Sequence, residues 1–397
     1  MKAGLLGRKL GHSLSPQIHR LFGDYAYRLY EREPETVESF LRSGFAGGEF
    51  DFLNVTIPYK QTAFALCDEL TPMAKKLGNV NFVTRTADGK LRGDNTDAYG
   101  VERLLDSVGA DVRGMKCAVL GAGGAAMTVR AVLEERGAAR VAFVRRGECP
   151  AVDDELIVNA TPVGMFPHGD EVRVDISRYA ACRYVLDLVY NPSPTRLVRE
   201  ALACGKVAAD GLVMLIAQAY RAFRLSTLNS QLSTLFLYGP PASGKSTLAK
   251  KIAAATGWQL VDLDAEIVRT AGRSIPEIFA AEGEMGFRAI EKHCLQSVCE
   301  GIVPLKTGTD PLGSRGTDPV VRTKVVALGG GALLDDECRK MAENAGRVIV
   351  LDCSLDVLKS RLTGGDRPLS ADTAKLERLV AARAAHYASF SRHIQMI

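Results

Sequence analysis

Two glycine-rich loops, each set between an apolar strand and a helix, constrain this 397-residue chain more than any other feature of its sequence. The first, LGAGGAAM, spans residues 120–127, and the second, YGPPASGKST, spans residues 238–247. A loop that opens a helix in this way directs backbone N–H groups toward a phosphate. The chain therefore either uses two nucleotides in one reaction or joins two nucleotide-dependent proteins end to end.

Length and composition favour a multidomain α/β protein. One domain usually takes roughly 100–200 residues, so we expect at least two hydrophobic cores. The net charge of +4 is small and the basic residues are scattered, so no nucleic-acid partner is expected. No apolar run is long enough for a membrane span or a signal peptide, and nine cysteines without C-x-x-C spacing indicate free, buried thiols. We therefore expect a cytoplasmic protein.

The pattern of strands, helices and turns predicts three domains. Residues 1–98 form an α/β domain that a helix at 212–224 completes. Residues 99–211 repeat strand–helix–strand units and predict a Rossmann domain. The polar repeat LSTLNSQLSTL makes residues 225–232 a linker. Residues 233–397 predict a parallel sheet between two layers of helices, a three-layer α/β/α fold.

The first loop fits the G-x-G-x-x-G/A spacing of a dinucleotide-binding turn. Its residues expected to face the pyrophosphate are Gly121, Ala122, Gly123, Gly124, Ala125 and Ala126. Arg145 and Arg146 follow the next strand, where a carboxylate would otherwise bind the ribose 2′-hydroxyl, so guanidinium groups there favour NADP over NAD. The structural alternative is a glycine turn that binds nothing, followed by two solvated arginines.

Four polar clusters precede this loop: GHSLSPQIH, NVTIPYK, NVNFVTR and GDNTDAYG. With them, the first 224 residues resemble the shikimate dehydrogenase family over nearly their full length. The resemblance implies that Lys60 and Asp97 form the catalytic dyad. The chemistry agrees, because reducing a ketone by hydride requires a proton at the developing alkoxide, and a lysine beside a carboxylate can supply it. Taken singly, Lys60 is typical of an exposed lysine and Asp97 of a helix cap.

The resemblance also implies the substrate contacts. Ser13 and Ser15 would hold the substrate carboxylate, although Ser15, just before Pro16, also suits a plain helix N-cap. The remaining implied contacts are Thr56, Asn81 and Gln218 to substrate hydroxyl groups, and Tyr190 and Gly211 near the substrate and the nicotinamide.

Two features depart from the family pattern. Only about ten residues separate Arg146 from the strand LIVNAT, where the family has a longer stretch with another helix. Phe82 stands where the family usually has a threonine. The first departure affects the side of the cofactor site that binds the adenosine ribose.

The second loop matches G-x-x-x-x-G-K-[ST] without a mismatch, after an apolar strand and before a helix. Lys245 would reach the transferred phosphoryl group, and Ser246 would ligate Mg²⁺. The residues expected to bind ATP are Gly239, Ser243, Gly244, Lys245, Ser246 and Thr247.

Five further motifs follow in the order found in the shikimate kinase family, which residues 233–397 resemble: LVDLDAEI, EGEMGFRAIE, LGGGA, DRPL and RAAHY. The resemblance implies that Asp262 helps to hold the metal and that Asp264 binds the acceptor hydroxyl and takes its proton. Arg288 and Arg383 would clamp a carboxylate. The other implied residues are Gly329, Gly330 and Gly331 against the ring, Arg367 in a lid, and Arg361 near the adenine.

This half also departs from its family. A polar insertion at about 304–322 precedes the LGGGA strand. The chain ends about ten residues past Tyr387, where the family continues with a strand and a helix. We therefore expect a shortened C-terminus and an exposed sheet edge.

The two loops together predict two consecutive reactions. The first half would reduce 3-dehydroshikimate to shikimate with NADPH, and the second would phosphorylate shikimate with ATP and Mg²⁺, in the biosynthesis of aromatic amino acids. One alternative is a shikimate- or quinate-binding regulator in which one half, more readily the kinase, has lost catalysis. Another is a pair of enzymes that act on quinate. The sequence leaves the oligomeric state open.

Overall fold

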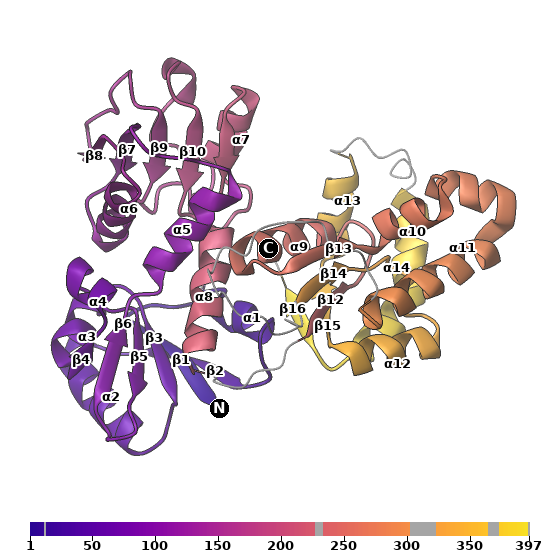
Figure 1. The fold of residues 1–397 in the computed structure, drawn as a ribbon, viewed down its shortest axis with the longest axis horizontal. Helices are drawn as coiled ribbons and strands as arrows, with labels where there is room; N and C mark the ends of the chain where they lie inside the picture. The colour runs from indigo at the N-terminus through magenta and orange to yellow at the C-terminus, as the bar shows by residue number, and fades with distance from the viewer. Residues whose placement is uncertain (12, 227–232, 302–322, 364–372, 396–397) are drawn as a thin grey trace, which may run out of the picture. The chain divides into compact units, whose positions relative to one another are not determined.

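The computed structural model describes residues 1–11, 13–226, 233–301, 323–363 and 373–395 (Figure 1). They form two compact units, which divide near residue 230. The first unit contains two sheets and the second contains one, so the predicted α/β class is confirmed. Of the predicted linker, Leu225 and Ser226 are described, as the end of a helix. The predicted insertion and Arg367 lie outside the described residues.

The first sheet is mixed, with the strand order β2-β1-β3-β5-β6-β4. Its strands are β1 (Lys2–Gly7), β2 (Ala26–Glu31), β3 (Phe52–Val55), β4 (Glu69–Leu70), β5 (Phe82–Arg85) and β6 (Leu91–Asp94). β1 runs parallel to β3, whereas β5 is antiparallel to both β3 and β6. The helices in this region are α1 (Ser15–Arg20), α2 (Val37–Ala46), α3 (Lys60–Leu66) and α4 (Pro72–Leu77).

The second sheet is parallel throughout and has the order β11-β10-β9-β7-β8. Its strands are β7 (Lys116–Leu120), β8 (Arg140–Val144), β9 (Leu156–Asn159), β10 (Tyr184–Asp187) and β11 (Val207–Ala209). The helices between β6 and the end of this unit are α5 (Asp97–Ser107), α6 (Gly124–Glu135), α7 (Arg196–Ala203) and α8 (Leu212–Ser226). Of these, α8 packs on the first sheet, where Ala222 clusters with Ala3, Phe52 and Phe82. Residues 145–155 join β8 to β9 without a helix, as the short spacing in the sequence predicts.

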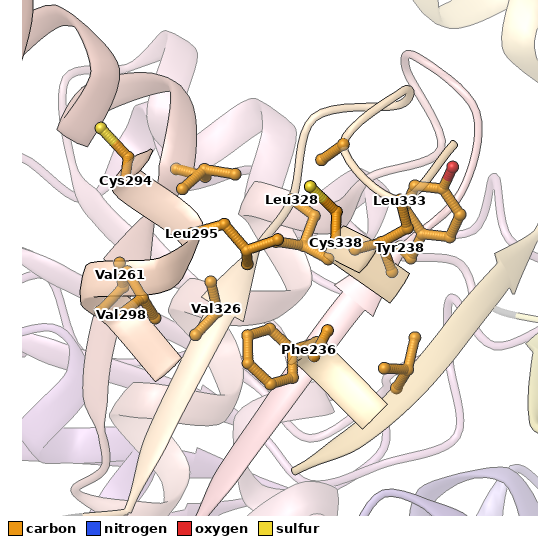
Figure 2. Close-up of a cluster of buried hydrophobic side chains, with 14 of the residues drawn as sticks. Phe236, Tyr238, Val261, Cys294, Leu295, Val298, Val326, Leu328, Leu333 and Cys338 are labelled. Carbon is orange, nitrogen blue, oxygen red and sulfur yellow. The ribbon is translucent and has the colours of Figure 1, made fainter. Parts of the chain in front are cut away.

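The third sheet is also parallel, with the order β13-β14-β12-β15-β16. Its strands are β12 (Thr234–Tyr238), β13 (Gln259–Asp262), β14 (Lys324–Ala327), β15 (Arg347–Asp352) and β16 (His393–Gln395). The helices are α9 (Lys245–Thr256), α10 (Leu263–Ala271), α11 (Ile275–Cys299), α12 (Asp336–Ala345), α13 (Leu355–Thr363) and α14 (Thr373–Ala388). Figure 2 shows the core, where Phe236 and Val326 from the strands pack with Leu295 from α11.

The prediction of a missing C-terminal strand, and with it an exposed sheet edge, is wrong for β15. β16 pairs in parallel with β15, so the edge of β15 is covered. Ile394 is the buried residue of this short strand, and His393 Nδ1 lies 2.9 Å from Asp352 Oδ1. One apolar side chain between polar neighbours is enough to seat a three-residue strand against the core, because side chains alternate between the two faces.

All nine cysteines are free thiols, but Cys149 and Cys204 are exposed, so the prediction of buried thiols is wrong for these two. In the described part of the chain, every helix is too short or too polar to traverse a lipid bilayer.

Candidate active sites

The topology of the first sheet brings the four polar clusters to one edge. β1, β3 and β6 end at this edge, and β5 begins there, because β5 runs antiparallel to its neighbours. Ser13 and Ser15 follow β1, Thr56 and Lys60 follow β3, Asn81 precedes β5, and Asp97 follows β6. Residues from four separate motifs therefore meet at one end of the sheet.

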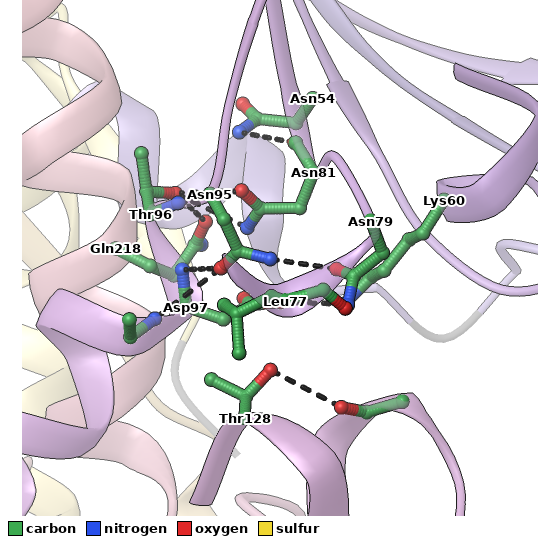
Figure 3. Close-up of polar contacts among 12 residues, drawn as sticks. Asn54, Lys60, Leu77, Asn79, Asn81, Asn95, Thr96, Asp97, Thr128 and Gln218 are labelled. Carbon is green, nitrogen blue, oxygen red and sulfur yellow. Dashed lines mark hydrogen bonds and ion pairs between the residues drawn. The ribbon is translucent and has the colours of Figure 1, made fainter. Parts of the chain in front are cut away.

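Lys60 and Asp97 are in direct contact (Figure 3). Lys60 Nζ donates to Asp97 Oδ2 over 2.5 Å, and the two side chains are 20% and 12% exposed. Each residue is the first of its helix, α3 and α5 respectively. The ion pair is partly exposed, so a substrate can reach it.

Asn81, Thr96 and Gln218 form a polar group beside this pair (Figure 3). Asn81 Oδ1 accepts from Thr96 N over 2.7 Å, and Asn81 Nδ2 donates to Thr96 Oγ1 over 3.1 Å. Thr96 Oγ1 also lies 3.5 Å from Gln218 Oε1 on α8. Sequence reasoning missed Thr96, although it lies in the same DNTD motif as Asp97. Phe82 points into the core against Phe52 and takes no part in this group.

Ser13 and Ser15 lie together, with 3.1 Å between their hydroxyl oxygens. Ser15 is the first residue of α1, and the N-cap is Leu14, so the alternative reading of Ser15 as a plain N-cap is wrong. Thr56 follows β3, and its backbone N–H donates to Leu6 O over 2.9 Å. Among the described residues, the hydrogen bonds do not link this serine pair to Lys60 or Asp97.

The dinucleotide turn lies where the strand order of the second sheet reverses, between β7 and β9, which is the usual ligand position in open α/β sheets. Gly121 follows β7 with φ 108°, and a Cβ there would lie 3.0 Å from Thr161 Cγ2. A Cβ at Gly123 or Gly124 would meet no atom within 4 Å. The start of α6 is therefore open to an anion. Ala122 is exposed, Ala125 half-buried and Ala126 buried.

Arg145 and Arg146 are exposed directly after β8. The preceding carbonyl, Val144 O, accepts from Gly121 N over 2.9 Å and from Arg173 Nη2 over 2.9 Å. The glycine turn thus bonds to the backbone of the residue that directly precedes Arg145, and Arg173, which the sequence did not single out, places its guanidinium group on the same carbonyl oxygen.

A buried carboxylate holds the loop that carries Tyr190. Asp187 accepts hydrogen bonds from Asn159 Nδ2, Val189 N and Thr195 Oγ1, and burial raises the pKa of this carboxyl to about 6. Burial also raises the pKa of the Tyr190 hydroxyl. Gly211 packs against the same loop, where a Cβ would lie 2.1 Å from Leu188 O, so no side chain fits at this position.

The phosphate loop of the second unit has the backbone that its glycines permit. Gly239 has φ 134° and Gly244, the N-cap of α9, has φ 94°. Lys245 Nζ donates to Gly239 O over 3.0 Å and to Pro240 O over 2.7 Å, so its ammonium group lies within the loop. Arg361 reaches the loop from α13, because its Nη1 donates to Ser243 O over 3.1 Å.

A hydroxyl and a carboxylate meet beside this loop. Ser246 Oγ donates to Asp262 Oδ2 over 2.8 Å, and Asp262 is also the N-cap of α10. Mg²⁺ is held by few protein oxygens together with waters and substrate phosphates, so this pair fits a magnesium site. Thr247 follows in the first turn of α9.

In the second unit, the residues predicted to bind the phosphoryl acceptor lie around the three glycines at 329–331. Arg288 Nη1 donates to Glu291 Oε2 over 2.5 Å, and Glu291 is buried. A Cβ on Gly329 would lie 2.8 Å from Glu291 Oε1 and 3.4 Å from Asp264 Oδ1. Sequence reasoning missed Glu291, although its spacing of three residues from Arg288 on one helix was a usable signal.

Gly330 and Gly331 complete the convergence. A Cβ on Gly331 would lie 2.6 Å from Arg288 Nη2. Gly330 O accepts from Arg383 Nη1 over 3.0 Å and from Tyr387 OH over 2.6 Å, both on α14. The helices α10, α11 and α14 therefore place charged groups around the glycine turn at residues 329–331.

Fold and geometry together define a protein with two nucleotide-binding units, one of the dinucleotide-dependent oxidoreductase type and one of the phosphoryl-transferring P-loop type. Residues 5–83 match the model of the shikimate dehydrogenase substrate binding domain. Residues 241–308 and 318–396 match the shikimate kinase model. Shikimate dehydrogenase (NADP(+)) of Clostridium perfringens strain SM101 is 36% identical over 248 residues, which cover 55% of this chain and 89% of the relative. The chain belongs to the shikimate dehydrogenase family, and its C-terminal region is a match to the shikimate kinase family.

Solved structures agree with this assignment for the first unit. Shikimate 5-dehydrogenase of Thermus thermophilus, in complex with NADP(H) and shikimate, superposes with a TM-score of 0.52 at 30% identity and covers 57% of this chain and 93% of that one. Quinate dehydrogenase of Corynebacterium glutamicum, in complex with NAD, superposes with a TM-score of 0.51 at 30% identity, with the same two coverages.

Proposed function

We propose that this chain catalyses two consecutive reactions, the NADPH-dependent reduction of 3-dehydroshikimate and the ATP-dependent phosphorylation of the resulting shikimate, as steps of aromatic amino acid biosynthesis. The observation that carries the first reaction is the contact between Lys60 and Asp97 at the polar edge of the first sheet. The proposed domains are residues 1–98 with 212–224, residues 99–211, and residues 233–397 after the linker 225–232.

In the first reaction, Lys60 donates a proton to the oxygen on the reacting carbon, and Asp97 holds the ammonium group in place. Ser13 and Ser15 bind the substrate carboxylate with their paired hydroxyl groups. The proposed ring contacts are Thr56, Asn81 and Gln218, with Tyr190 and Gly211 on the nicotinamide side. Because such a pocket pairs buried polar groups with each substrate hydroxyl, an analogue that lacks one leaves those groups unsatisfied.

The cofactor of this reaction is NADPH, which supplies the hydride. Residues 121–126 are proposed to face its pyrophosphate at the open N-terminus of α6. Arg145 and Arg146 are proposed to bind the 2′-phosphate, a task that suits the bidentate guanidinium group.

In the second reaction, Asp264 accepts the proton of the substrate hydroxyl, and Arg288 and Arg383 bind the carboxylate. ATP with Mg²⁺ supplies the phosphoryl group. Ser246 and Asp262 are proposed to hold the metal, and Lys245 the phosphates. Arg361 and Arg367 are proposed to contact the nucleotide, and Gly329, Gly330 and Gly331 to leave room for the ring.

Two coupled assays on the purified chain test this proposal. We expect NADPH oxidation with 3-dehydroshikimate, and ADP release with shikimate and ATP. The control is the reverse reaction, in which oxidation of shikimate with NADP(+) is compared with oxidation of quinate with NAD(+), since a quinate dehydrogenase in complex with NAD is 30% identical to the matched part of this chain. A preference for quinate would overturn the substrate assignment, and shikimate binding without turnover would favour the regulator.

Gly331→Ala tests the acceptor site of the kinase unit. The new methyl group would lie 2.6 Å from Arg288 Nη2, the end of a flexible side chain, so the guanidinium group has to move while the backbone stays. A hydrogen-bonded charged group contributes about 1.5–3 kcal/mol, so KM for shikimate should rise roughly 10- to 100-fold. Steady-state kinetics of ADP release measure it, and an unchanged KM would place the carboxylate elsewhere.

A further inference from the structure

The carboxamide of Asn95 has partners of two kinds, backbone N–H groups and another side-chain amide (Figure 3). Its Oδ1 accepts from the backbone N–H groups of Asp97, over 3.0 Å, and Ala98, over 3.3 Å. Its Nδ2 donates to Asn79 Oδ1 over 2.6 Å. Asn95 is only 4% exposed and Asn79 only 6%, so both amides sit in the interior of the first unit.

Asn95 therefore caps α5 from a position one residue before the usual one. Thr96 is the N-cap of this helix, yet its side chain makes no capping bond, because it is engaged with Asn81. The free N–H groups in the first turn of a helix attract a carboxylate in the same turn. Because Asn95 already accepts from these N–H groups, the carboxylate of Asp97 contacts Lys60 instead.

Asn79 belongs to a segment that also holds the main chain of Lys60. The next residue, Val80, donates its backbone N–H to Lys60 O over 3.0 Å. Asn79 Nδ2 donates to Leu77 O over 3.1 Å, which fixes the amide so that its oxygen faces Asn95. Residues 77–80 thus contact the backbone of Lys60 through Val80. Through Asn79 they contact Asn95, which caps the helix that Asp97 begins.

We propose that Asn79 and Asn95 form a buried amide pair that positions Lys60 against Asp97, and that both are positioning residues for the reduction. A continuous path runs from Lys60 O through Val80, Asn79 and Asn95 to the backbone N–H of Asp97, and it uses neither side chain of the dyad. The path fixes the backbone positions from which the side chains of Lys60 and Asp97 extend. The inference rests on the proposed function of the dyad, because it assigns these amides a task only if the dyad transfers the proton.

Positioning of this kind acts on turnover more than on substrate binding. A displacement of about 1 Å in a catalytic group can cost about 10²-fold in rate. The proposed substrate contacts Ser13, Ser15 and Gln218 have no hydrogen bond to Asn79 among the described residues, so they keep their places when its amide is removed.

The test measures three variants of the full chain, Asn79→Ala, Asn95→Ala and the double variant. Asn79→Ala should lower kcat of NADPH oxidation about tenfold, whereas KM for 3-dehydroshikimate and the Kd of NADPH change less than about twofold. The double variant should be no slower than Asn95→Ala alone, because the two amides act through one bond. Turnover is expressed per NADPH-binding site, counted by the calorimetric stoichiometry of NADPH. Only the first unit is proposed to bind NADPH, whereas both units are proposed to bind shikimate, so a loss of folded first unit cannot imitate the result.

Tyr59→Phe is the matched control. It removes a partly buried hydrogen bond, from Tyr59 OH to Arg32 O, next to Lys60 in the chain but outside the amide path. Its kcat per site should equal that of the parent. If Asn79→Ala retains parental kcat per site, or if Tyr59→Phe loses as much, the positioning role is refuted.

Lys60→Ala separates this inference from the function on which it rests. Loss of turnover in Lys60→Ala with full turnover in Asn79→Ala refutes the amide pair alone. Retained turnover in Lys60→Ala refutes the dyad, and the positioning inference falls with it.

Discussion

We expect Lys60→Ala to lower kcat for the reduction by about 10³-fold and to leave ADP release by the same molecules unchanged. General acid catalysis by a positioned side chain contributes about 10²- to 10⁴-fold. The structure holds the ammonium group of Lys60 2.5 Å from Asp97, with little exposure to solvent, so a water molecule replaces it poorly. NADPH oxidation and ADP release, recorded on one preparation, give both rates.

Lys76→Ala is the matched control for this experiment. Lys76 forms an ion pair with Glu135 in which the side chains are 48% and 54% exposed, and such surface pairs contribute little. We expect both of its rates to stay within about twofold of the parent. If Lys60→Ala also slows ADP release, the two units do not act independently and the assignment of separate sites is wrong.

We expect Lys245→Ala to produce the reverse pattern, with phosphorylation lowered by about 10²- to 10³-fold and reduction unaffected. A loss of this size is expected when a preorganised hydrogen-bond donor that stabilises a charged transition state is removed. The loop keeps its shape without the lysine, because the positive φ angles of Gly239 and Gly244 set its course. Nζ lies on the carbonyls of Gly239 and Pro240, within the loop that is proposed to hold the phosphates.

Lys250→Ala on the same helix serves as the control for Lys245→Ala, since Lys250 is an exposed lysine of α9. It should leave both reactions at the parental rate. ADP release at saturating ATP and shikimate is the measurement, and a Lys245→Ala chain with parental phosphorylation would mean that the loop binds nucleotide without assisting transfer.

Local features were the most predictable part of this protein. The two glycine-rich loops form within about ten consecutive residues, so spacing and glycine content decide them. The absence of a helix between β8 and β9 followed from the short segment available. These features depend on residues that are adjacent in the sequence, so tertiary contacts change them little.

Features built from distant residues were harder to predict. Thr96 meets Gln218 across 122 positions, and Glu291 becomes a buried partner of Arg288 only when the glycine turn packs over it. β16 is a strand because β15 offers a vacant edge, which the three residues His393–Gln395 could not reveal alone. Cys204 resembled a buried thiol in the sequence but lies on the surface.

The sequence by itself determined two phosphate-binding turns, the α/β class of both units and the residue types available for each reaction. Only the tertiary structure decided which of those residues meet. Lys60 and Asp97 lie 37 positions apart, and their contact depends on β3 and β6 ending at one edge of a sheet and on the hydrogen bonds that lead from one to the other. The physical reason is that a turn is set by the φ and ψ angles of consecutive residues, whereas a contact between strands is set by the packing of the whole sheet.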